Sequence, residues 1–256
     1  MFFWKVVSMK VLSIGNSFSM NAHAYLERMA AAGKTDMVLG NLFIGGCSLE
    51  RHYNNMKNDT PDYDYQIHSD GGYAVIHNHT LYHALISDDW DVITFQQVSN
   101  FSGKPDTFEP YLGELVNYVR GYQPNAKLML HETWAYEYGN SALDKYGNNP
   151  KQMYSEIEAA YNFYSEKYGF EIIPCGKAFE EARKIDIFDN ENGGKSLCAP
   201  DLHHASAPHG QYLLGAVWYE KLTGKSILEN PYSVDGISFY ELMSLKKAAR
   251  IAVNSK

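Results

Sequence analysis

The chain has 256 residues and a formal net charge of −8, with 45% hydrophobic and 20% charged residues. This composition is ordinary for a globular protein, and the length predicts a single domain spanning residues 1–256. The acidic balance argues against a nucleic-acid partner, because nucleic-acid binding needs a basic face. Three cysteines without a CxxC pair argue against a disulfide framework or a cysteine-based zinc site. No apolar run reaches the roughly 18 residues of a membrane span, so no membrane association is expected.

The first 15 residues are apolar but do not have the pattern of a signal peptide. They lack a basic leader and a small-residue cleavage site, and they run directly into the first predicted strand. We therefore expect a cytoplasmic protein, with an exported form as the alternative if a leader has been removed.

Five apolar runs of strand length follow one another along the chain, separated by helix-like segments. The runs are nearly continuous rather than alternating, which is typical of strands buried on both faces. They cover residues 10–15, 37–44, 91–97, 127–134 and 171–175. The predicted helices cover residues 21–32, 106–122, 150–168, 210–222 and 238–253. This alternation predicts an α/β fold, a three-layer α/β/α sandwich with a flavodoxin-like parallel sheet of about five strands.

Two segments interrupt the alternation. Residues 58–80 are rich in turn formers, and a short alternating piece follows a glycine pair, which predicts a hairpin insertion at the rim of the domain. Residues 186–200 have the composition of a loop.

Ser17 follows the first predicted strand and precedes the first predicted helix. Ligands of open parallel sheets bind beyond the carboxyl ends of the strands, so a serine at this place is a candidate nucleophile. It is equally suited to cap the helix, because small polar residues are common in such turns.

A nucleophilic serine needs a base, and the base needs an orienting partner. Asp201 and His204 are three residues apart, a spacing that one helical turn would bring to the same face. His203 is an alternative base, since the pattern alone does not distinguish the two histidines.

Residues 15–19 (GNSFS) are similar to the Gly-Asp-Ser motif of the SGNH (GDSL-type) hydrolases, with asparagine in place of aspartate. In that superfamily the motif follows the first strand, and an Asp-x-x-His motif lies near the carboxyl end of the domain. The resemblance implies a serine ester hydrolase with Ser17 as nucleophile, His204 as base and Asp201 as its partner. It also implies that no metal or organic cofactor is needed.

The resemblance suggests where the oxyanion would be held. The first expected oxyanion donor is the backbone N–H of Gly46, in the turn after the second predicted strand, and the N–H of Gly45 is the alternative to it. The backbone N–H of Ser17 is the second expected donor. Such donors stabilise the charge that develops in acyl transfer.

The third predicted strand departs from the family pattern. The superfamily has Gly-x-Asn-Asp there, whereas residues 95–100 of this chain read FQQVSN. A glutamine amide donates as an asparagine amide does. We therefore assign the third oxyanion donor to Gln97, with Gln96 and Asn100 as alternatives.

The expected substrate is a small-molecule or carbohydrate ester with a short acyl group, in the first place acetyl. Gln96, Asn100 and Trp134 are the candidate substrate-binding residues. One alternative is a lipase or thioesterase-type acyl hydrolase, and another is a non-catalytic carbohydrate-binding protein on the same fold. Histidines at 77, 79, 203 and 204 do not form a recognised metal-binding frame, so no metal site is expected. The oligomeric state is not predicted.

Overall fold

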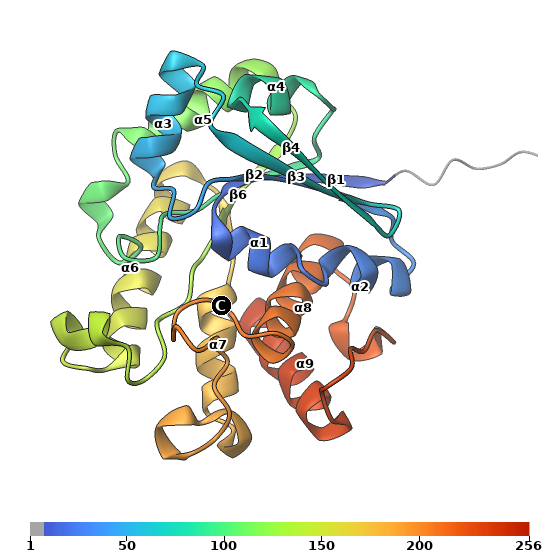
Figure 1. Cartoon of the computed structure of the whole chain (residues 1–256), viewed down its shortest axis with the longest axis vertical. Coiled ribbons are helices and arrows are strands. Elements are labelled where there is room, and N and C mark those ends of the chain that lie inside the picture. Colours follow the sequence, from blue (N-terminus) through green and yellow to red (C-terminus); the bar gives the residue numbers. More distant parts are fainter. Residues whose placement is uncertain (1–7, 256) are drawn as a thin grey trace, which may run out of the picture.

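A computed structural model describes residues 8–255 (Figure 1), so that the apolar start considered as a leader lies largely outside the described residues. Seven strands form one sheet in the order β4-β3-β2-β1-β5-β6-β7. Their bounds are β1 (Met9–Gly15), β2 (Met37–Phe43), β3 (Tyr63–Ser69), β4 (Gly72–His79), β5 (Val92–Phe95), β6 (Lys127–His131) and β7 (Glu171–Ile173). Strands β2, β1, β5, β6 and β7 are parallel and correspond to the five predicted strands. Their order is that of flavodoxin-like sheets, so the predicted α/β class is confirmed.

The sheet is larger than predicted because the segment 58–80 joins it. Strands β3 and β4 form a hairpin, and β3 pairs antiparallel with β2. Asp70 and Gly71 connect the two strands with φ values of 51° and 72°. Two positive φ values in a two-residue connection are typical of a type I′ turn, whose twist matches that of the flanking strands. The predicted rim hairpin therefore extends the sheet from five strands to seven.

Helices cover both faces of the sheet (Figure 1). Helices α3, α4 and α5 pack against one another on one face, whereas α1, α2, α7, α8 and α9 form the layer on the other. Helix α6 contacts β7 and α7. No helix within residues 8–255 combines the length and apolar character needed to cross a membrane. The bounds are α1 (Ser17–His23), α2 (Leu26–Ala32), α3 (Leu49–Asn58), α4 (Leu81–Ile86), α5 (Tyr111–Tyr122), α6 (Pro150–Tyr168), α7 (Cys175–Arg183), α8 (His209–Thr223) and α9 (Phe239–Asn254).

Two predicted helices differ clearly from the structure at their starts, whereas α8 and α9 differ from the predicted bounds by one residue at each end. The helix predicted over 21–32 begins earlier, at Ser17, and is divided at Ala24 and Tyr25 into α1 and α2. The helix predicted over 106–122 begins at Tyr111, after a short 3₁₀ turn at Pro105–Thr107. Prolines at 105 and 110 lack the N–H of a regular helix, so the first turns of this segment are irregular.

Candidate active site

Ser17 lies at the point where β1 ends and α1 begins. Asn16 is the N-cap of α1, and its side-chain oxygen accepts a hydrogen bond from the N–H of Phe18 at 2.9 Å. Ser17 is therefore the first helical residue, and its hydroxyl is not the cap. A Cβ at Gly15 would lie 2.2 Å from Ser19 Oγ, so the glycine leaves the space that the Ser19 side chain occupies.

The three residues predicted as a triad lie together, although Ser17 and His204 are 187 residues apart in sequence. The His204 Nε2 atom is 2.7 Å from Ser17 Oγ, and the His204 Nδ1 atom is 2.7 Å from Asp201 Oδ2. These two contacts use both nitrogens of one imidazole ring. The ring can accept the serine proton at Nε2 while its Nδ1–H remains bonded to the carboxylate.

The Asp201 carboxylate is held in its ionised form by the turn that carries it. Its Oδ1 atom accepts hydrogen bonds from the backbone N–H groups of His203 and His204, each at 3.0 Å. Partial burial alone would raise the pKa of Asp201, but these N–H donors and the His204 ring lower it to about 2. Leu202 has a left-handed φ of 61°, which turns the chain back so that both N–H groups face the carboxylate.

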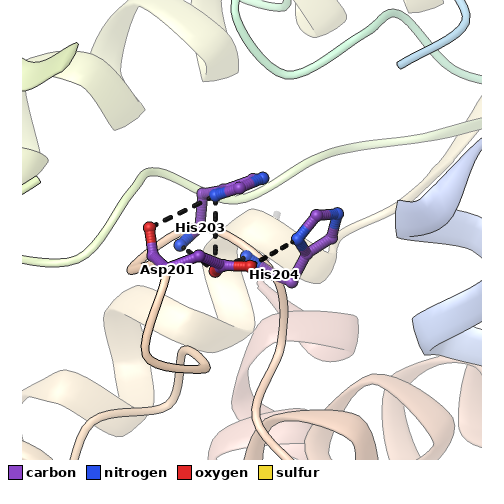
Figure 2. Close-up of side chains that lie close together, drawn as sticks. All are labelled: Asp201, His203 and His204. Carbon is purple, nitrogen blue, oxygen red and sulfur yellow. Dashed lines mark hydrogen bonds and ion pairs between the residues drawn. The ribbon is translucent and has the colours of Figure 1, made fainter. Parts of the chain in front are cut away.

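His203 lies beside this pair without reaching Ser17. Figure 2 shows both histidines gathered around Asp201. The ring centroids of His203 and His204 are 4.0 Å apart, and His203 Nδ1 is 3.3 Å from Asp201 Oδ1. The geometry therefore selects His204 as the partner of Ser17. Asp201, His203 and His204 also have the spacing of a metal-binding cluster. Asp201 and His204, however, already bond to each other, and His204 also contacts Ser17.

Trp134 has a different place from the one predicted. Its side chain is fully buried, so it is not available to a substrate, and the prediction that it binds substrate is wrong in this respect. The indole Nε1 donates a hydrogen bond to the His203 carbonyl at 2.8 Å. Its ring stacks on Phe18 with centroids 4.0 Å apart and on Phe179 at 5.0 Å. Trp134 thus supports the turn of residues 201–204, here called the histidine turn, through its hydrogen bond to His203.

The turn after β2 brings Gly46 to the same edge of the sheet. Gly46 has a φ of 63°, a left-handed conformation that favours glycine. Asn16 Nδ2 donates to the Cys47 carbonyl at 3.0 Å, which joins this turn to the residue before Ser17. Within the described residues, the N–H groups of Ser17 and Gly46 have no hydrogen-bond acceptor. Both remain candidate oxyanion donors.

Gln97 does not have the geometry predicted for it. Its side-chain oxygen accepts from the N–H groups of Leu49 and Val98, and its Nε2 donates to the carbonyl and hydroxyl of Thr107. Only 1% of the residue is exposed. Because the amide is fully engaged within the protein, Gln97 has no donor left for an oxyanion, and that assignment is corrected.

The two alternatives to Gln97 occupy different environments. Gln96 is also buried, and its Nε2 donates to the Asn16 side-chain oxygen at 2.6 Å. It therefore contacts Asn16 in the serine loop, the segment of residues 15–17 between β1 and α1, and is not exposed to a substrate. Asn100 is exposed in the turn after β5, so its predicted role in substrate binding stays a prediction.

Asn21 contributes to the site and was not predicted. Its side-chain oxygen accepts the N–H of Ala205 at 3.1 Å, which ties the histidine turn to the helix of Ser17. The signal was present in the sequence, because Asn21 follows Ser17 by one helical turn and shares its face.

Comparisons with known proteins show the family to which the chain is similar. A family model described as a domain of unknown function (DUF4886) matches residues 10–252. The crystal structure of a DUF4886 family protein from Bacteroides uniformis is 37% identical, with a TM-score of 0.90 over 96% of this chain and 95% of that chain. No curated protein matches the chain.

Two more distant structures share the fold. A protein from Slackia heliotrinireducens described as a candidate SGNH hydrolase is 20% identical, with a TM-score of 0.56 over 84% of this chain and 98% of that chain. An acetyl xylan esterase, AlAXEase, is 14% identical, with a TM-score of 0.54 over 82% of this chain and 98% of that chain. The predicted SGNH-type fold is confirmed by these likenesses.

Proposed function

The chain belongs to the DUF4886 family and has the fold of the SGNH hydrolases, and on this basis we propose that it is a serine hydrolase of carboxylic esters. The observation that carries the proposal is the continuous contact from Ser17 Oγ through His204 to Asp201, with both distances at 2.7 Å. A protein that only binds its ligand has no need of a serine, a base and an orienting carboxylate in this arrangement.

The proposed reaction has two steps. Ser17 Oγ attacks the carbonyl carbon of the ester while His204 Nε2 takes the serine proton, and the N–H groups of Gly46 and Ser17 stabilise the resulting oxyanion. His204 then donates that proton to the leaving alcohol oxygen, which leaves an acyl group on Ser17. In the second step His204 takes a proton from water, the hydroxide oxygen attacks the acyl carbon, and the proton returns to Ser17 Oγ as the acid departs.

We propose a short acyl group, in the first place acetyl, carried by a carbohydrate or another small molecule. The site is open, since about a third of the His204 side chain and 42% of the Asp201 side chain are exposed. The AlAXEase likeness is one of fold, and it makes acetylated polysaccharide the first class to test. Tyr138 is 46% exposed and lies in the segment whose Glu137 N–H and Asn140 amide bond to the Asp201–Leu202 turn. It offers an aromatic surface beside the site for a sugar ring.

The test is hydrolysis of p-nitrophenyl acetate by the wild type and by Ser17→Ala, His204→Gln and His203→Gln. We expect the first two variants to lose about 10³-fold or more in kcat/KM, because each removes a group that reacts in both steps. His203→Gln is the matched control, and it should retain most of the activity because its ring does not reach Ser17. Intact mass after treatment with a phosphonate should show one label, lost in Ser17→Ala.

Two outcomes would change the proposal. An inert wild type that takes no phosphonate label would favour the non-catalytic carbohydrate-binding alternative, and binding to a sugar array would be measured next. Greater activity on long-chain p-nitrophenyl esters than on acetate would instead favour a lipase or thioesterase-type hydrolase.

A further inference from the structure

A buried chain of three polar side chains lies behind Ser17 and takes no direct part in the proposed reaction. Asn16, Gln96 and His131 are each at most 2% exposed and follow or end three neighbouring strands, β1, β5 and β6. Gln96 Nε2 donates to Asn16 Oδ1 at 2.6 Å, and His131 Nδ1 is 2.9 Å from Gln96 Oε1. Buried polar groups of this kind are costly unless they are paired, so their orientation is well determined.

Two backbone groups determine the orientation of Asn16. The N–H of Phe18 can only donate, so the side-chain atom that faces it at 2.9 Å must be the oxygen. The Cys47 carbonyl can only accept, so the atom that faces it at 3.0 Å must be the nitrogen. No aspartate could satisfy both groups in its ionised form, because it has no hydrogen to donate to Cys47.

The rest of the chain follows from this orientation. Because Asn16 presents its oxygen, Gln96 must present Nε2 to it and Oε1 to His131, and His131 must then carry its hydrogen on Nδ1. Burial lowers the pKa of His131 to about 3, so the ring remains neutral and keeps this single tautomer. A Cβ at Gly15 would lie 3.1 Å from Gln96 Oε1, so the glycine also leaves room for the glutamine.

We infer that Asn16, Gln96 and His131 position the Gly46 turn against Ser17, and that this requires asparagine at position 16 rather than the aspartate of the Gly-Asp-Ser motif. The inference rests on the proposed function, because it concerns the donors that would hold the oxyanion. Asn16 holds the Cys47 carbonyl at 3.0 Å, and the Cys47 N–H donates to the Ile44 carbonyl at 3.2 Å, which closes the turn that contains Gly46. The Asn16–Cys47 bond therefore ties this turn, at its last residue, to the residue before Ser17. All three are positioning residues, since none of them contacts the reacting atoms.

An aspartate at position 16 would disturb this arrangement in two ways. Its second oxygen would face the Cys47 carbonyl oxygen and push the Gly46 turn away from Ser17. Its negative charge would also lie in a buried place close to the oxyanion that forms in the reaction, where it would raise the barrier. Both effects disappear when the carboxyl is protonated, because its O–H can donate to the carbonyl as Nδ2 does.

The experiment compares Asn16→Asp with Asn16→Ala on p-nitrophenyl acetate between about pH 5.5 and about pH 8. At the upper end we expect Asn16→Asp to lower kcat by about 10- to 100-fold with little change in KM, since misplacing an oxyanion donor acts on the transition state. As the pH falls, the rate of Asn16→Asp relative to wild type should rise, because burial raises the pKa of a carboxyl group into this range. Asn16→Ala loses the same hydrogen bond without adding a titrating group, so its relative rate should be low and independent of pH.

The other titratable groups around position 16 do not produce this signature. They are His131 on β6, Cys47 after β2, His52 on α3 near the Gly15 carbonyl, and His204. Burial lowers the pKa of His52 to about 3 and raises that of Cys47 to about 12, so neither titrates in this range. His204 is present in the wild type and in every variant, and Asn16→Ala shows how the rate depends on pH when the Cys47 hydrogen bond is lost without an added carboxyl group.

Gln96→Glu and Gln96→Ala form a second pair if the Asn16 variants do not fold, which thermal unfolding would reveal. In Gln96→Glu a carboxylate oxygen would face the Asn16 oxygen, so the relative rate should again rise at low pH, whereas that of Gln96→Ala should not. The inference is overturned if Asn16→Asp has the wild-type kcat at pH 8, or if only the unfolding temperature changes. A wild type as inert as Ser17→Ala would overturn the proposed function and this inference together, whereas an active wild type with an unaffected Asn16→Asp overturns this inference alone.

Discussion

Single amide side chains hold the loops around Ser17 together by using both ends of the amide group. Gln97 joins three segments, since its oxygen accepts from Leu49 at the start of α3 and its nitrogen donates to Thr107 in the turn before α5. Asn16 joins two, the serine loop and the turn after β2. Removing one partner of such a buried pair costs more than the hydrogen bond itself contributes, because the other partner remains buried and unsatisfied.

Gln97→Ala should therefore act on stability and not on chemistry. We expect the free energy of unfolding to fall by about 2–3 kcal/mol, because the N–H of Leu49 and the groups of Thr107 lose their partner. The kcat of the folded variant, measured on p-nitrophenyl acetate well below its unfolding temperature, should stay close to that of the wild type. A loss of about 100-fold in kcat at unchanged stability would instead restore Gln97 as an oxyanion donor.

The difference between Ser17 and Gln97 shows which roles of single side chains can be predicted from the sequence. Ser17, Asp201 and His204 carry their chemistry in short motifs whose place in the chain is itself informative. Gln97 and Trp134 lie at the predicted sheet edge as well, but groups far away in sequence determine the direction of each side chain. Gln97 is held by Leu49 and Thr107, and Trp134 is held by the His203 carbonyl. No local pattern contains that information.

Among the secondary-structure elements, helix α6 was predicted with its bounds because both of its ends are marked in the local sequence. Helix α6 has Pro150 in its first turn and Gly169 after its last residue, and it has the predicted bounds. Helix α7 was not predicted, because it has nine residues and no side-chain cap of its own. Its cap is Glu132, which directly follows β6. The Glu132 Oε2 atom accepts a hydrogen bond from the Lys177 N–H at 3.0 Å. A cap supplied from 45 residues away leaves no signal in the sequence around the helix.

Glu132 gives α7 a pH-dependent stability. Burial raises the pKa of this carboxyl to about 8, although the Lys177 N–H opposes the shift. The unfolded chain, with an ordinary pKa, releases the Glu132 proton at lower pH than the folded chain. The contribution of Glu132 to the free energy of unfolding is therefore complete below about pH 4.5, and it is lost as the pH rises toward 8.

Glu132→Gln should remove this dependence while keeping the shape of the side chain and an oxygen for the Lys177 N–H. We expect the variant to gain stability relative to wild type as the pH is raised from about 5 to about 8. Urea unfolding midpoints of both proteins at several pH values measure the gain. A difference between the two midpoints that does not change with pH would contradict the assignment of Glu132 as the titrating group.

For the whole molecule, the order of the strands explains how residues from both ends of the described chain meet. Strand β1 is central in the sheet, between β2 and β5, and α8 packs against α1 and α2. The histidine turn immediately precedes α8, so docking of α8 brings His204 to Ser17. The parallel order of the sheet could be predicted from the alternation of strands and helices, whereas the pairing of the hairpin with β2 could not.

This arrangement predicts that activity returns late in refolding. After dilution from urea, the helical signal in far-ultraviolet circular dichroism should recover before the hydrolysis of p-nitrophenyl acetate, because contacts between distant segments form slowly. Both signals are measured on the same sample. Simultaneous recovery at every protein concentration would show that the site forms together with the helices.

The 187-residue separation of Ser17 and His204 has a consequence for the protein during its synthesis. A nascent chain contains Ser17 and Gly46 long before the ribosome has added His204. Throughout this period Ser17 lacks the contact with His204 that the proposed reaction requires. Under the proposed function, hydrolysis therefore begins only after His204 has been synthesised and α8 has packed against α1.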